Sequence, residues 1–422
     1  MQLSSHLHLT YCTNIHLGET WEEIFRSLET YVLPLKQALS PDAPFAIGLR
    51  LSDQASRVLI EAKELEAFQT WLQTHDLYVF TMNGFPYGGF HGQRVKDDVH
   101  RPDWTTTDRR DYTIRLARIL AQLPNAPASS QSSDAGISTS PLSYRGWFST
   151  PEDRDQAITA GCVHLAEVVK ELIGIALETG KIIHIDIEPE PDGFIDHVQD
   201  TIELFNQKLI PAVTMYLVDT LSVKHAAAEE LARTHLQVCY DVCHFALMYE
   251  YPEKALRAFA EAGIRIGKVQ ISAALKADLP PQPEARNLLA DAFKTLAEST
   301  YLHQVVARKT SLSAQEEWTA RQHYPDLPDA LPHIHDPAIA EWRTHFHVPV
   351  FVRDYGLLQS TQDDIRTVIA LVKADLLQNG GKSFTHHLEV ETYTWEVLPP
   401  ELKINLSDSI EREMKWVLGQ LM

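Results

Sequence analysis

Short apolar runs, separated by longer stretches with apolar residues at helical spacing, are the feature that most constrains how this chain folds. Such an alternation is typical of βα units arranged around a parallel sheet. Eight runs match the strand number of a TIM barrel, and barrels with insertions reach this chain's 422 residues. We therefore predict an α/β fold, a (β/α)8 TIM barrel, in one domain over residues 1–422. The predicted strands are residues 6–11, 45–51, 77–82, 136–140, 181–188, 236–241, 266–272 and 387–392.

Two segments depart from this alternation. Residues 125–143 are rich in Ser, Ala and Pro, which predicts a loop, yet they must also contain the fourth strand. Residues 273–386 separate the last two strands by far more than one helix, and Pro349 interrupts their apolar run 345–352. Because proline removes a donor from the ladder, that run fits an edge strand or the end of a strand. We expect 273–386 to form an elaborated lid with extra elements, and 396–422 a C-terminal helical cap.

Charge and composition narrow the classes of partner. The 37 Lys and Arg against 57 Asp and Glu give a net charge of -20, which repels a phosphate backbone and argues against a nucleic-acid partner. No basic flank precedes an apolar run at the N-terminus, and no run of about 18 apolar residues occurs. We therefore expect no membrane insertion and a cytoplasmic protein. The 4 cysteines form no CxxC pair, so we expect neither a disulfide framework nor a thiolate zinc site.

The parity of the predicted strands indicates a polar barrel interior. Side chains alternate along a strand, so one set faces the helices and the other faces the inside of the barrel. In residues 183–188 the isoleucines Ile183, Ile185 and Ile187 form one set, which leaves His184, Asp186 and Glu188 facing inward. An unpaired carboxylate in that position costs several kcal/mol. A bound cation is the simplest way to neutralise such carboxylates.

Four inward oxygen donors fall at or near the C-terminal ends of strands, where active sites lie in this fold. They are Glu188, Asp241, Gln270 and Glu391. Three carboxylates and one amide oxygen suit Mn or Mg, with Co or Zn if a histidine joins them. We predict that these four residues bind one divalent metal ion (Mn, Mg, Co or Zn). The alternative for any one of them is a strand-end ion pair with Arg50 or Lys268.

Other residues are candidates for binding a substrate. Asn83 opens the loop 83–92, whose glycines and aromatic residues suit a pocket wall, although a merely well-packed loop explains them nearly as well. His347 shares a face with His345, and a hydrogen-bonded core histidine is the alternative for each. Arg50 and His8 face inward by parity on the second and first strands. Arg50 could bind an anion or form a salt bridge inside the barrel.

Several motifs resemble the metal-binding pattern of xylose-isomerase-like TIM barrels. They are Ile187-Glu188-Pro189, Asp241-Val242-Cys243-His244, Val269-Gln270-Ile271 and Glu391. The glutamine is closer to the hydroxypyruvate isomerase version than to the sugar epimerases. Within that superfamily, longer blocks resemble the metabolite traffic protein EboE family. The blocks are 8–16 (HLTYCTNIH), 78–92 (YVFTMNGFPYGGFHG), 345–350 (HFHVPV) and 388–395 (LEVETYTW), and they span nearly the whole chain.

The resemblance implies roles for the same residues. Glu188 and Glu391 would be both metal ligands and the catalytic acid/base pair, Asp241 and Gln270 would be ligands, and His244 would contact the substrate. Two carboxylates flanking a sugar carbon can take a proton from one carbon and return it to another, while a metal polarises the adjacent carbonyl. The long insertion before Glu391 departs from the pattern and leaves a small-sugar substrate open.

Three functions follow as hypotheses. The first is a metal-dependent sugar isomerase or epimerase acting on a polyhydroxylated or keto metabolite, in the trafficking of a secondary-metabolite precursor. The resemblance then implies a small-molecule metabolite as ligand and other proteins of a metabolite-export gene cluster as partners. The second is a non-catalytic metabolite-binding or carrier protein on the same barrel. The third is an endonuclease of the superfamily, which the charge of -20 disfavours.

Overall fold

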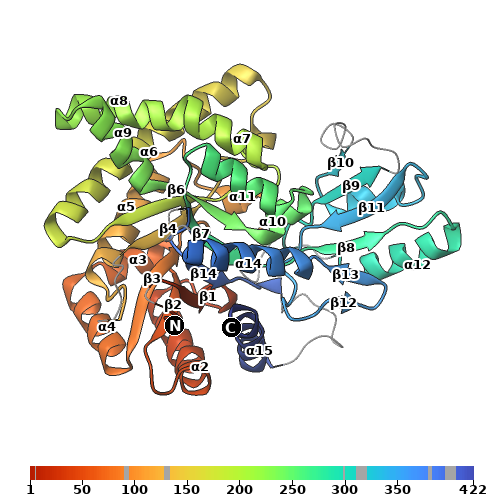
Figure 1. Ribbon diagram of the computed structural model, residues 1–422, viewed down its shortest axis with the longest axis horizontal. Helices are drawn as coiled ribbons and strands as arrows, with labels where there is room; N and C mark the ends of the chain where they lie inside the picture. The colour runs from red at the N-terminus through yellow and green to blue at the C-terminus, as the bar shows by residue number, and fades with distance from the viewer. Residues whose placement is uncertain are drawn as a thin grey trace.

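Eight parallel strands form the centre of the molecule, as predicted. The computed structural model describes residues 1–4, 6–89, 95–127, 134–297, 300–309, 321–378, 383–394 and 405–422. The strands pair in the order β1-β14-β7-β6-β5-β4-β3-β2, and a bridge between Cys12 and Gly48 joins the first to the last, so the sheet closes as a TIM barrel (Figure 1). The strands are β1 (His8–Tyr11), β2 (Phe45–Arg50), β3 (Leu77–Asn83), β4 (Ala135–Thr139), β5 (Ile183–Ile187), β6 (Leu236–Asp241), β7 (Ile266–Ile271) and β14 (His387–Val390).

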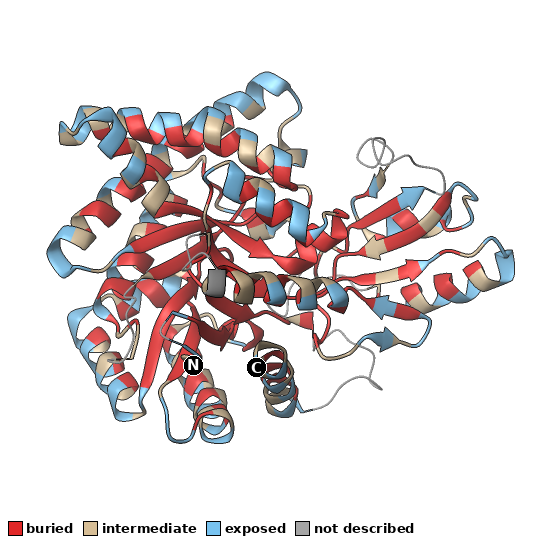
Figure 2. Ribbon diagram, viewed as in Figure 1, coloured by how far each residue is buried: buried red, intermediate tan, exposed pale blue. Residues whose placement is uncertain are grey.

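Helices surround this barrel and shield its outward-facing apolar side chains. The isoleucines of β5 are fully buried, which confirms that one face of that strand packs into the core (Figure 2). The helices are α1 (Trp21–Ser27), α2 (Leu33–Leu39), α3 (Asp53–Leu59), α4 (Ala62–Thr74), α5 (Thr107–Gln122), α6 (Pro151–Thr179), α7 (Val198–Glu203), α8 (Ile210–Leu221), α9 (His225–His235), α10 (Val242–Leu247), α11 (Pro252–Glu261), α14 (Gln362–Gln378) and α15 (Leu406–Leu421). None of the described helices is long and apolar enough to cross a membrane.

Local sequence signals explain where these helices begin and end. Thr20 and Glu23 form a reciprocal capping box at the start of α1, which satisfies backbone donors that the helix itself leaves unpaired. Thr150 caps α6, whose first residue is Pro151, and Gly180 ends that helix with a φ of 73°. Glycine is favoured there because a left-handed backbone costs it no steric strain.

The region between β7 and β14 forms a second sheet beside the barrel (Figure 1). Six antiparallel strands pair in the order β10-β9-β11-β8-β13-β12. They are β8 (Leu275–Asp278), β9 (Val305–Lys309), β10 (Arg321–Tyr324), β11 (Ile339–Thr344), β12 (Asp354–Tyr355) and β13 (Leu358–Ser360), with helices α12 (Pro283–Lys294) and α13 (Leu327–Ala330). Strand β11 ends at Thr344 and the run 345–352 contains no strand, so Pro349 lies neither in an edge strand nor at the end of a strand.

Parts of three predicted segments lie outside the described residues. These parts are 128–133 of the predicted loop, residues 298–299, 310–320 and 379–382 of the insertion, and 395–404 before the C-terminal helix. Strand β4 is present within the weakest predicted segment. That the insertion acts as a lid remains a prediction. The C-terminal cap includes α15, whose N-cap is Asn405.

Candidate active site

Three carboxylates from three separate strands meet at the C-terminal mouth of the barrel. Glu188 follows β5, Asp241 ends β6 and Glu391 follows β14. Each offers an oxygen, and these three oxygens all lie within 4.8 Å of one another. All three side chains are buried. The barrel fold therefore brings together three of the four residues predicted to bind a metal.

The local structure around Asp241 leaves one of its oxygens unpaired. Asp241 is the N-cap of α10, and its Oδ1 accepts hydrogen bonds from the backbone amide of His244 at 3.2 Å and from Ser272 Oγ at 2.6 Å. Its Oδ2 has no hydrogen-bond partner, although the residue is fully buried. Buried carboxylate oxygens are almost always paired. The orphaned oxygen therefore fits a ligand position.

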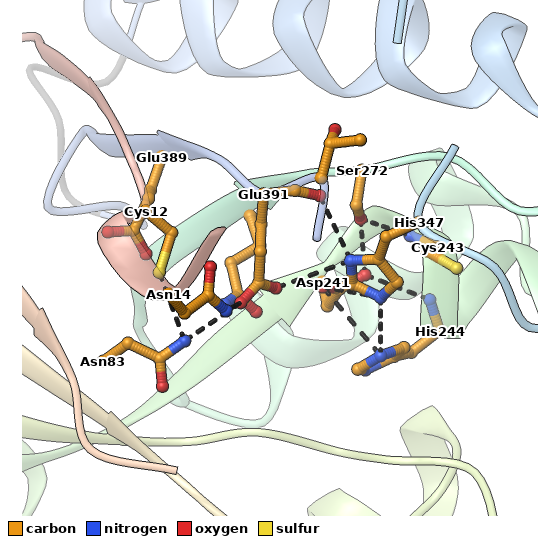
Figure 3. Close-up of polar contacts among 12 residues, drawn as sticks. Cys12, Asn14, Asn83, Asp241, Cys243, His244, Ser272, His347, Glu389 and Glu391 are labelled. Carbon is orange, nitrogen blue, oxygen red and sulfur yellow. Dashed lines mark hydrogen bonds and ion pairs between the residues drawn. The ribbon is translucent and has the colours of Figure 1, made fainter. Parts of the chain in front are cut away.

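Two amide side chains orient Glu391. Its Oε1 accepts from Asn14 Nδ2 at 2.8 Å and from Asn83 Nδ2 at 2.9 Å (Figure 3). Asn83 ends β3, and Asn14 lies in the short 3-10 turn after β1. Asn83 was predicted to bind substrate, whereas its observed contact is with Glu391. Asn14 was not predicted individually, and its only sequence signal is its place in the block 8–16.

Burial and mutual repulsion raise the pKa of the two glutamates. Desolvation, followed by repulsion from Glu391, Asp241 and Glu190, holds the pKa of Glu188 well above its usual value. Desolvation and repulsion from Asp241 and Glu389 raise the pKa of Glu391 in the same way. Two unit charges 4 Å apart repel by about 4 kcal/mol at an effective dielectric of 20. The carboxylates therefore either bind protons or require a cation between them.

Three histidines stand beside the carboxylates. His347 Nε2 and His244 Nε2 each lie 3.9 Å from Asp241 Oδ2, and the two imidazoles approach to 3.4 Å (Figure 3). His347 Nδ1 lies 3.6 Å from Glu391 Oε2. Burial lowers the pKa of His244, His345 and His347. These histidines are therefore neutral, which is the form that binds metal ions.

The donor set fits a divalent transition metal. Glu188 Oε2 and Asp241 Oδ2 are buried without hydrogen-bond partners, and the ligand atoms of Asp241, His244 and His347 also lie within 4.8 Å of one another. Carboxylate oxygens with imidazole nitrogens suit Mn, Co or Zn better than an all-oxygen site does. His347 comes from the insertion, and from the sequence it was a candidate for binding substrate.

Gln270 has one described side-chain hydrogen bond. Its Oε1 accepts from Cys239 Sγ at 3.2 Å, which leaves the second lone pair of the amide oxygen available. A role of Gln270 as a ligand remains a prediction. The alternative for the four predicted ligands was an ion pair with Arg50 or Lys268, and Lys268 Nζ pairs instead with Glu389 Oε2 at 2.5 Å. Among the described contacts, Lys268 forms no ion pair with Glu188, Asp241 or Glu391.

Two predicted substrate contacts are corrected. His8 faces inward, but it is the first residue of β1, and its Nδ1 lies 3.0 Å from Tyr78 Oη near the N-terminal end of the barrel. Parity gave its face correctly and could not give its depth along the axis. Arg50 forms a salt bridge with Glu19 at 3.1 Å and donates to the carbonyl of Gly18. Arg50 therefore forms a salt bridge, but with a residue of the loop after β1 and not inside the barrel.

A pocket with a cavity volume of about 60 Å³ opens above the carboxylates. Glu188, Glu391, His244 and His347 form part of its polar side. Its remaining described lining residues are Asn14, Asn83, Phe85, Pro86, Val95, Lys96, Val99, His100, Glu190, Tyr301, Leu302, Gln304, His345 and Tyr393. The loop after β3 and the segment 345–350 thus border one mouth, as expected, although residues 90–92 of that loop lie outside the described part.

Glu190 is a polar residue of the pocket that the sequence analysis missed. Its Oε2 lies 3.2 Å from His244 Nε2, and its Oε1 lies 4.0 Å from His345 Nδ1. Burial and repulsion from Asp241 and Glu391 raise its pKa. The sequence did contain a signal for this residue. Glu190 lies two residues after Glu188, just beyond Pro189, so it follows the same strand end.

Several solved structures are similar to this chain, whereas no protein-family model matches it and no curated protein matches it. An IolI protein with a binding zinc atom has a TM-score of 0.46 and 12% identity, over 98% of this chain and 98% of its own. A xylose isomerase-like TIM barrel protein from Mycobacterium smegmatis in complex with magnesium has a TM-score of 0.46 and 10% identity, over 100% and 98%. The probable 3-DHS dehydratase AsbF from Bacillus anthracis has 0.41 and 11%, over 98% and 99%. Membership of the metabolite traffic protein EboE family is not confirmed.

Proposed function

We propose that the protein is a divalent-metal-dependent isomerase or epimerase that acts on a polyhydroxylated or keto metabolite. The observation that supports this most is the convergence of three buried carboxylates, two of whose oxygens, Glu188 Oε2 and Asp241 Oδ2, accept no hydrogen bond from a described group. Glu188, Asp241 and Glu391 would hold the ion, with His347 or His244 completing the ligands. When bound, the metal polarises a substrate carbonyl and its neighbouring hydroxyl.

The two glutamates supply the proton transfer. Asn14 and Asn83 occupy Oε1 of Glu391, which leaves Oε2 as the atom that accepts a proton from carbon. Glu188, on the other side of the triad, returns a proton. Return to the neighbouring carbon, with transfer of the substrate's hydroxyl proton to the former carbonyl oxygen, isomerises the substrate, and return to the opposite face of the same carbon epimerises it.

The cellular role follows from the sequence resemblance. We propose that the protein works in the cytoplasm, in the trafficking of a secondary-metabolite precursor, with other proteins of a metabolite-export gene cluster as partners. The carrier hypothesis places the same metabolite in the same pocket without the proton transfer. The isomerase and carrier functions therefore share the binding step and differ only in the proton transfer. A single substitution that removes one carboxylate charge distinguishes them.

The variant Glu391→Gln tests the proton transfer. With Mn bound, we expect the parental protein to exchange deuterium from solvent into the carbon next to the carbonyl of a hydroxyketone, as measured by NMR. In the variant, we expect the exchange rate to fall by a factor of about 10² to 10⁴. The amide oxygen should keep the contacts with Asn14 and Asn83 and turn the NH2 group toward the ion, so the exchange rate is measured at saturating Mn. The control is Glu66→Gln, which changes an exposed glutamate outside the pocket. Exchange at the parental rate in Mn-saturated Glu391→Gln would contradict the base role of Glu391, and no exchange in the parental protein would favour the carrier function.

A further inference from the structure

We infer that the substrate is an uncharged, amphipathic hydroxyketone whose aromatic or branched apolar body lies against one wall of the pocket. The inference rests on the proposed function and specifies its substrate class. The wall consists of Phe85, Val95, Val99, Tyr301 and Tyr393, which we call the apolar wall. The carboxylates and histidines form the other side, so the pocket has one polar and one apolar half.

The apolar wall is assembled from distant parts of the chain. Phe85 follows β3, Val95 and Val99 precede α5, Tyr301 belongs to the insertion and Tyr393 follows β14. Val95 and Tyr301 form a buried apolar cluster against which Val99 and Tyr393 pack. The rings of Tyr301 and Tyr393 meet edge to face with centroids 5.1 Å apart. Such a wall offers stacking and apolar contact to a ligand.

The pocket offers little to a negatively charged substrate. Lys96 is the only Lys or Arg among its described lining residues, and its Nζ pairs with Asp326 and donates to the carbonyl of Tyr301 at 3.2 Å. Nearby Arg109 donates to the backbone carbonyls of Gly84 and Phe85 instead of facing the pocket. Apart from the proposed metal ion, a phosphate on the substrate would therefore meet glutamates and no unpaired Lys or Arg among the described lining residues.

A free sugar also fits this division poorly. Its hydroxyl groups are spread along the whole molecule, so those facing the apolar wall would lose water without gaining hydrogen-bond partners. A hydroxyketone head needs polar partners at one end only. Glu391, Glu188 and the histidines supply them there, while Gln304 and His345 extend the polar side. The pocket therefore favours one polar head on an apolar body.

A matched pair of probes tests this class. Hydroxyacetone and 2-hydroxyacetophenone carry the same hydroxyketone head, and only the second carries a phenyl ring. With Mn-loaded protein in calorimetric titrations, we expect the phenyl compound to bind at least about tenfold more tightly, since one methylene alone is worth that much in an apolar pocket. Fructose and dihydroxyacetone phosphate should bind more weakly than the phenyl compound. Tighter binding of either would overturn the inference.

Val99→Thr tests the wall itself, because threonine keeps the shape of valine and adds a hydroxyl. We expect the preference for the phenyl compound to fall several-fold while the affinity for hydroxyacetone stays unchanged. Val58→Thr, at a valine 42% exposed on the surface, is the matched control. An unchanged preference in Val99→Thr would contradict the role of the wall.

Deuterium exchange separates this inference from the proposed function. Preferred binding of the phenyl compound without exchange in the parental protein would refute the isomerase function and keep the substrate class. Exchange into fructose, with no preference for the phenyl compound, would refute the substrate class and keep the isomerase function.

Discussion

The barrel interior holds two layers of buried acids that the chain treats differently. In the lower layer, Glu389 pairs with Lys268 at 2.5 Å and Asp186 pairs with His184 at 2.6 Å, all four fully buried. In the upper layer, the described residues provide no Lys or Arg ion pair to Glu188, Asp241 or Glu391. Their ion-pair neighbours are the histidines His244 and His347, whose pKa is lowered by burial.

This difference shows which buried acids mark a site. A carboxylate inside a barrel is not by itself a metal ligand, because Glu389 has a lysine of its own. The upper triad has the same burial without a fixed cation. Because leaving a charge uncompensated is costly, the upper layer is stable only with protons or with a cation from outside the chain.

Breaking the lower pair should have the largest effect on stability. Lys268→Met leaves Glu389 buried without a cation, and we expect the free energy of unfolding to fall by about 3 to 5 kcal/mol. Urea denaturation of the metal-free protein measures it. Arg26→Met, which removes an exposed ion pair with Glu22, is the control and should cost less than about 1 kcal/mol. Equal losses in both variants would show that the lower layer does not depend on its lysine.

The lower layer also depends on space, which Gly267 provides. A Cβ at Gly267 would lie 1.7 Å from Asp186 Oδ1. We therefore expect Gly267→Ala to destabilise the protein by about 1 to 3 kcal/mol, as overpacking does. Gly174→Ala, within α6 and at a position where an added Cβ would meet no atom within 4 Å, should be neutral or stabilising. Thermal unfolding measures the difference. If the unfolding midpoint of Gly267→Ala falls no further than that of Gly174→Ala, the neighbouring atoms move aside with little loss of stability.

The upper layer should show the opposite response to removal of a charge. The raised pKa of Glu188 and Glu391 means that the folded metal-free protein holds protons that the unfolded chain releases near 4.5. Its stability should therefore be full below that pH and fall as pH rises toward the folded pKa. At pH 8 we expect chelator-treated Glu188→Gln to be more stable than the parent by about 1 kcal/mol. Denaturation from pH 5 to 8 measures this, and a less stable variant at pH 8 would contradict the repulsion.

The fold was predictable because its signals are local. Each of the eight barrel strands is a short apolar run, and parity correctly placed His184, Asp186 and Glu188 inside. The convergence of Glu188, Asp241 and Glu391 followed from the same parity and from the common mouth that parallel strands share.

Contacts between distant segments were not predictable in this way. Parity gives the face of a side chain and not its depth, which is why His8 was misplaced. The pairing of Arg50 with Glu19 depends on how the loop after β1 folds back. The position of His347 beside Asp241 depends on the path of a long insertion, for which strand periodicity carries no information.

Metal binding tests the account most directly. Purified protein, stripped with chelator and titrated with Mn in a calorimeter, should bind one ion per chain. Saturation to 100 times the Kd should raise the free energy of unfolding by about 2.7 kcal/mol. Asp241→Asn, which alters the orphaned oxygen, should weaken binding at least tenfold, whereas Glu66→Gln, at an exposed glutamate, should not. Absence of Mn, Co and Zn binding in the parent, or unchanged affinity in Asp241→Asn, would contradict the assignment of the upper layer as a metal site.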